Sequence, residues 1–153
     1  MGVLASIVAW AHIGAVVVAV GGSAFVLFVL RPLVLRTMEP SVAMSLMGAV
    51  QLRFRWLIWG AILVLVVTGV WMAMEFRGIT SLQALTHTSF GQTLVVKSLL
   101  SIVFFAGALS VTLPISWLAS FRRHQVAIFR FNLLGAVVIT LLATLMVRQG
   151  GVF

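Results

Sequence analysis

Long apolar runs, separated by short segments that carry prolines and arginines, form the main pattern of this sequence. A helix that crosses a bilayer needs about 17 to 25 mostly apolar residues. Four stretches reach that length, and they predict membrane-spanning helices over residues 3–30, 56–76, 90–118 and 131–147. The predicted fold is therefore all-α and integral to the membrane, a single four-helix bundle over residues 1–153.

Local signals refine the ends of these helices. Pro32 follows Arg31 and predicts the end of the first helix, because the residue before a proline avoids the helical region. Glu39-Pro40-Ser41 is typical of a helix start with proline in the first turn, so residues 40–54 are predicted to extend the second helix on the cytoplasmic side. Ser89 and Gln92 have the spacing of a capping box, which predicts a start at Ser89. Pro114 predicts a kink or an early end in the third helix.

The distribution of basic residues predicts the orientation. The segments after the first and third helices hold Arg31, Arg36, Arg53, Arg55, Arg122, Arg123 and Arg130, whereas the other side holds Arg77, Lys97 and Arg148. By the positive-inside rule, both termini and the loop over residues 77–91 are extracytoplasmic. The net charge of +8 is spread over helix ends, which favours anionic lipid headgroups over nucleic acid as the partner.

Composition excludes several chemistries. The chain has no cysteine, which removes disulfides, thiolate metal sites and cysteine nucleophiles. Glu39 and Glu75 are its two acidic residues, so a Ser-His-Asp triad is impossible within the chain and a carboxylate pair is not expected.

His12 and Lys97 are the polar residues that stand out inside the predicted spans. Each lies about eight or nine residues from the outer start of its helix, roughly 12 to 13 Å along the axis. Ionisable groups inside a membrane are candidates for function. Two alternatives stay open: Lys97 can extend to the interface, and the small residues near His12 (Ala15, Ala19 and Gly22) either leave room for a ligand or let helices approach.

Further side chains could bind a metal at the same outer end. Met72 and Glu75 share a helix face, and His87 in the outer loop could add a nitrogen ligand. Met44 and Met47 share a face on the cytoplasmic side, whereas His124 is expected to be surface charge. Three threonines are expected to bond to their own helices (Thr68, Thr140 and Thr144), and Asn132 to bond across helices.

Several of these motifs resemble the copper-resistance D (CopD) family. Trp10-Ala11-His12 with Gly21-Gly22 and Leu30-Arg31-Pro32 resembles its first helix, and Arg53-Phe54 with Val67-Thr68-Gly69 resembles its second. Thr86 to Gly91, continuing to Lys97, resembles the threonine-aromatic-glycine-lysine signature of the family. The resemblance implies copper handling in a bacterial inner membrane, beside a periplasmic copper-binding partner.

Arg130-Phe131-Asn132 is similar instead to the related HemJ family of four-helix haem-binding proteins, which are linked to protoporphyrinogen oxidation. That resemblance implies haem b, with His12 matching the haem-ligand histidine and Lys97 matching a functional lysine.

Three functions follow as hypotheses. The first is copper binding or transit, with His12, Met72, Glu75 and His87 as ligands. The second is a haem b redox protein in which His12 is an axial ligand and Lys97, Arg77 and Arg148 pair with propionates. The third is an accessory subunit, or a homo-oligomer, without a cofactor of its own. Whether the chain is an enzyme is left open.

Overall fold

The computed structural model describes residues 2–77, 82–113 and 123–149, and these residues form helices and short connections. Four helices in this part of the chain are long and apolar enough to span a membrane: Val3–Thr37, Pro40–Glu75, Ser89–Thr112 and Gln125–Leu145. The prediction of an all-α membrane protein with four spans is therefore confirmed.

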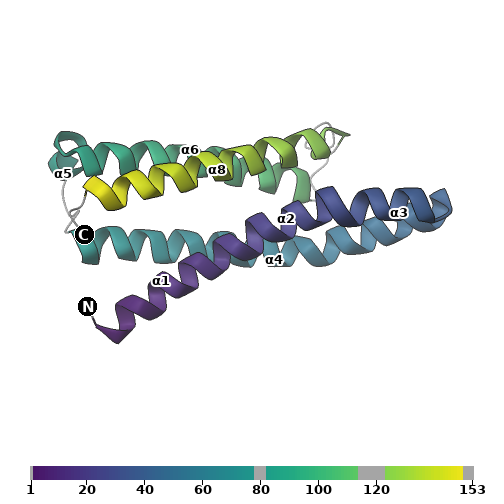
Figure 1. Cartoon of the computed structure of the whole chain (residues 1–153), viewed down its shortest axis with the longest axis horizontal. Coiled ribbons are helices and arrows are strands. Elements are labelled where there is room, and N and C mark those ends of the chain that lie inside the picture. Colours follow the sequence, from purple (N-terminus) through teal and green to yellow (C-terminus); the bar gives the residue numbers. More distant parts are fainter. Residues whose placement is uncertain (1, 78–81, 114–122, 150–153) are drawn as a thin grey trace.

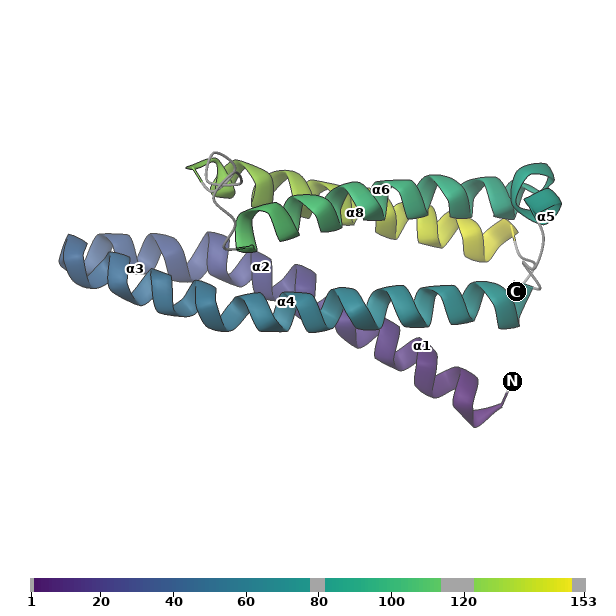
Figure 2. The same cartoon turned by 180° about the vertical axis from the view of Figure 1, so that it is seen from behind.

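The helices are arranged as two antiparallel pairs (Figures 1 and 2). The column that begins with α1 (Val3–Val16) packs on α4 (Pro40–Arg77), and α6 (Ser89–Thr112) packs on α8 (Gln125–Gln149). Contacts within each pair are more extensive than contacts between the pairs. Gly2 and the end of α8 lie at the same end of the bundle, the terminal end. Toward the other end, where α3 (Arg31–Thr37) lies and α8 begins, Arg31 and Arg55 line one cavity and Arg123 precedes α8, so we call it the arginine-rich end.

The first helix does not stop at Arg31 and Pro32, so the predicted end at residue 30 is wrong. Helical structure continues from α1 through two π-helical segments, η1 (Val17–Gly21) and η2 (Val26–Leu30), with α2 (Gly22–Phe25) between them, to α3 (Arg31–Thr37). Pro32 lies in the first turn of α3, where a missing N–H is tolerated. The wide turn before it bonds the N–H of Arg31 to the carbonyl of Val26. Such π-turns bend helices, and the column diverges from α4 toward Gly2 (Figure 1).

The second helix is one continuous element of 38 residues, which confirms that residues 40–54 extend it. At 1.5 Å per residue it is about 57 Å long, whereas the hydrocarbon layer is about 30 Å thick. The helix is therefore longer than a span of the hydrocarbon layer requires.

The start of α6 differs in detail from the predicted capping box. A short helix that the sequence did not predict, α5 (Leu82–His87), precedes it. Thr88 is the cap, because its backbone is extended and its Oγ1 accepts a hydrogen bond from the N–H of Gly91 at 2.9 Å. Gln92 donates its Nε2 to the carbonyl of Thr86 at 2.9 Å instead of closing a capping box. Ser89 is thus the first helical residue and not the cap.

Thr88→Ala should expose the first turn of α6 to fraying. A lost threonine cap costs about 1 kcal/mol, which corresponds to roughly fivefold faster amide hydrogen exchange at Gly91. Ser89→Ala is the matched control, because the bond from Thr93 uses the Ser89 carbonyl and survives the substitution. A larger effect from Ser89→Ala than from Thr88→Ala would contradict this assignment of the cap.

The remaining helix ends agree in part with the ends that the sequence predicted. α6 ends at Thr112, and Leu113 is extended immediately before Pro114, so the early end is confirmed. Residues 114–118 of the predicted helix lie outside the described residues. α8 begins at Gln125, six residues before the predicted start at residue 131.

Small residues allow the helices to approach closely, and most large apolar side chains face outward. Buried alanines occur in three of the four spans (Ala5, Ala15, Ala43, Ala61 and Ala108), and the fourth, α8, has buried Gly135. Among the described residues, no large side chain is fully buried, and Trp10 is 73% exposed. Because lipid tails solvate apolar side chains, such a surface suits a bilayer and not water.

Candidate functional site

A hydrogen bond between α1 and α4 joins the two most unusual polar positions of the first helix pair. Nδ1 of His12 lies 2.7 Å from Oγ1 of Thr68, which is 8% exposed. Oγ1 of Thr68 also lies 2.5 Å from the carbonyl of Val64, to which the hydroxyl donates its proton. Both hydrogen bonds form together when neutral His12 carries its proton on Nδ1.

This tautomer leaves a lone pair on Nε2 of His12. Histidines that bind metals commonly donate the other ring N–H to a fixed acceptor, which orients the ring and raises the basicity of the ligating nitrogen. The Thr68 hydroxyl supplies that acceptor here. The arrangement can hold one imidazole nitrogen as a ligand in a fixed direction.

Close approach of the two helices makes this hydrogen bond possible. A Cβ at Gly69, the residue after Thr68, would lie 3.6 Å from Cε1 of His12, in ordinary contact. A Cβ at Gly22 would lie 2.8 Å from the Phe54 ring, so Phe54 fills the space beside that glycine. At Gly22, ten residues along the helix from His12, the small residue thus serves helix packing.

Lys97 lies in the first half of α6, at the terminal end, and is half-buried. No described acidic residue forms an ion pair with it, and Glu39 and Glu75 are both exposed. The ammonium group is therefore available to an anionic partner.

The other predicted ligands do not gather around His12. Met72 is half-buried in α4, one turn beyond Thr68, whereas Glu75 is exposed and His87 is exposed at the end of α5. Among the described residues, no three histidine, cysteine or acidic side chains lie together as a metal cluster. Arg77 and Arg148 are placed near the terminal ends of α4 and α8, but their side chains lie outside the described part of the chain.

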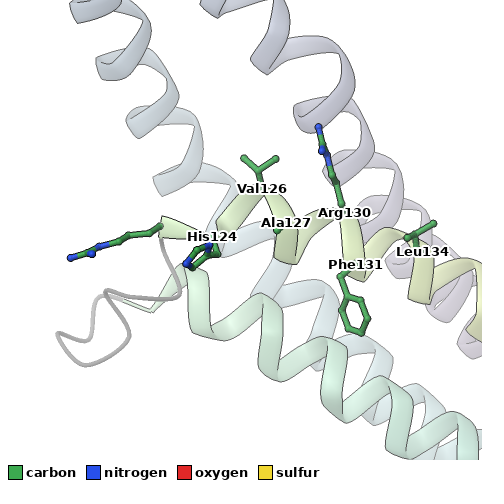
Figure 3. Close-up of a pocket in the computed structure, with 7 residues that line it drawn as sticks. His124, Val126, Ala127, Arg130, Phe131 and Leu134 are labelled. Atoms are coloured by element: carbon green, nitrogen blue, oxygen red, sulfur yellow. The ribbon is translucent and has the colours of Figure 1, made fainter.

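The remaining metal candidates lie at the arginine-rich end. Met44 is exposed and Met47 lines a cavity there, near the start of α4. His124 is exposed before the start of α8, and Figure 3 shows that its ring does not converge with Arg130 or Phe131. His124 therefore stands as surface charge, in agreement with the sequence.

The partnership with Thr68 is the feature that sequence reasoning missed. Thr68 was expected to bond to its own helix, which it does, as do Thr140 and Thr144. The depth of Thr68 in its helix could have indicated this partner. Thr68 lies nine residues before Arg77, and His12 lies nine residues after Val3. Two antiparallel helices bring such positions to the same level. Asn132 confirms its prediction, because its Nδ2 donates to the Phe104 carbonyl across the α6–α8 interface at 3.1 Å.

No protein-family model, curated protein or solved structure matches this chain. The resemblance to the CopD and HemJ families therefore stays a prediction from the motifs quoted above.

Proposed function

We propose that this chain is a membrane redox protein that binds haem b, with Nε2 of His12 as an axial ligand. The observation that supports this proposal is the hydrogen bond between Nδ1 of His12 and Thr68, which orients the ring and favours the tautomer with a lone pair on Nε2. A porphyrin needs one or two axial protein ligands, whereas a bare metal ion needs a cluster of them.

The surrounding charges fit a porphyrin that carries two propionates. Lys97 lies in the first half of α6, in the neighbouring helix pair, and has no described acidic partner. It would pair with one propionate. Arg77 and Arg148 lie at the same end of the bundle and remain candidates for the second. Bound haem supplies reversible one-electron transfer, and the protein contributes a directed imidazole, a compensating cation and a surrounding of low polarity.

Copper handling is the second candidate, and Met72 favours it. Its thioether is half-buried one turn from Thr68, and soft sulfur and imidazole ligands suit copper(I). Under this proposal His12 and Met72 would form the centre, with Glu75 and His87 reaching it only after movement. By the positive-inside rule we place either site at the extracytoplasmic side of a bacterial inner membrane, where a redox partner or a periplasmic copper-binding protein could reach it.

Purification in detergent separates these proposals. Haem binding predicts a red protein with a Soret band and stoichiometric iron. Copper binding predicts a colourless protein that retains copper after treatment with a chelating resin. A protein with neither property, even after addition of haem or copper(I), would overturn both proposals and favour an accessory subunit.

Thr68→Val should weaken cofactor binding without removing the ligand. Valine has nearly the shape of threonine but accepts no hydrogen bond, so the imidazole loses its fixed direction. Loss of such an outer contact typically lowers metal affinity about 10- to 100-fold. Titration with haem, followed by the Soret absorbance, measures this change. Thr140→Val is the control, because its hydroxyl bonds only to its own helix, and Thr68→Ser should restore affinity.

A further inference from the structure

A second site lies at the arginine-rich end, where the two helix pairs enclose a cavity of about 520 Å³. Its volume falls within the range of about 300 to 1,000 Å³ that is usual for sites of small ligands. Apolar side chains from several helices line most of it, including Leu27, Val111 and Phe129. Arg31 and Arg55 add two positive charges to the same wall.

Two hydrogen bonds between the helix pairs hold this region together. Nε2 of Gln51 in α4 donates to Oε1 of Gln125 in α8 at 2.9 Å. Nε1 of Trp59 in α4 donates to Oγ1 of Thr112 in α6 at 3.1 Å. These two hydrogen bonds hold the helix pairs together around the cavity, at the level where α6 ends and α8 begins.

Arg55 supplies an independent sign of a missing partner. Its guanidinium carbon lies 5.5 Å from the Trp56 ring centroid and 5.6 Å from that of Trp59, so the two indoles support the charge. Its Nε is buried, and no acceptor among the described residues reaches it. A buried N–H without an acceptor is costly, and an anionic oxygen would satisfy it.

The lining of the cavity indicates the ligand class. Two arginines beside a mostly apolar lining suit a ligand with an anionic head and an apolar chain, and a chain with four membrane spans meets such a ligand as an anionic phospholipid. Neither Glu39 nor Glu75 lines the cavity. We propose that this cavity binds one anionic phospholipid, with its phosphate at Arg55 and Arg31 and an acyl chain between the helix pairs.

Native mass spectrometry of the full chain in detergent tests the proposal. Titration with phosphatidylglycerol should give one tightly bound lipid, at least about tenfold more tightly than phosphatidylcholine. Arg55→Gln should reduce this preference about tenfold or more, since a charge-assisted hydrogen bond and a neutralised charge are lost. Arg55→Lys keeps the charge but loses the fork of donors, and it should fall between the two.

Arg53→Gln is the matched control. It removes the same charge at a position two residues from Arg55, and Arg53 is exposed and does not line the cavity. Equal losses for Arg53→Gln and Arg55→Gln would show only general attraction to the membrane surface and would overturn the proposal. Competition by inorganic phosphate or glycerol phosphate as strong as that of the whole lipid would assign the site to a free anion instead. Thermal unfolding of each variant without lipid shows whether the fold is retained.

Discussion

His12→Ala is expected to abolish haem binding by the purified protein. The imidazole is the proposed iron ligand, and its hydrogen bond to Thr68 sets the direction of the ring. The Soret band should disappear. Haem affinity should fall by more than the roughly 100-fold upper limit expected when only the hydrogen-bond partner of the ligand is removed, as in Thr68→Val. Absorbance after reconstitution with haem measures both effects.

Two controls distinguish ligation from general damage. His87→Ala and His124→Ala remove exposed imidazoles at opposite ends of the bundle and should leave the spectrum unchanged. Free imidazole added to His12→Ala should restore part of the band, because it can occupy the ligand position. A Soret band that persists in His12→Ala would assign the iron to another residue and would remove the basis of the proposed function.

Gly135→Ala is expected to destabilise the α6–α8 pair strongly. A Cβ at this buried position would overlap the Phe104 ring, which lies directly over the glycine. Phe104 also packs against Phe131, with ring centroids 5.3 Å apart, so the ring cannot move without disturbing a second contact. Inserting a carbon into such a contact typically costs about 1 to 3 kcal/mol. The midpoint of thermal unfolding in detergent measures the loss.

Gly60→Ala provides the comparison for this substitution. A Cβ there would meet nothing within 4 Å, so alanine should have no steric cost and should favour the helix. Phe104→Leu combined with Gly135→Ala should cost less than the sum of the single substitutions, because the smaller side chain relieves the overlap. Equal midpoints for Gly135→Ala and the unmodified protein would contradict the packing of α6 on α8 described above.

Depth in the membrane was predictable from the sequence, whereas partnership across helices was not. The sequence predicted one depth for His12 and Lys97, because each lies eight or nine residues inside its helix. The hydrogen bond to Thr68 joins residues 56 positions apart, and it depends on how α1 and α4 rotate toward each other. Hydropathy and residue spacing do not predict how two helices rotate toward each other, because both describe one helix at a time.

Local backbone detail was also beyond a reading of motifs. Proline after Arg31 predicted a stop, but π-helical turns before it carry the helix to Thr37. Thr88 and Ser89 are both preferred residue types at a helix N-cap. The actual cap is Thr88, because its backbone is the extended one. The cavity beside Arg55 is likewise lined by four segments that are distant in the chain, so no single motif predicted it.

The amino-acid sequence by itself determined that this chain forms four membrane-spanning helices. In hydrocarbon every backbone N–H and C=O must be bonded internally, so a long apolar segment has few alternatives to a helix. The tertiary structure decided which faces meet, and hence that His12 is oriented by Thr68 and that Arg55 borders a cavity. Those outcomes depend on the shapes of small and aromatic side chains from different helices, which only packing brings together.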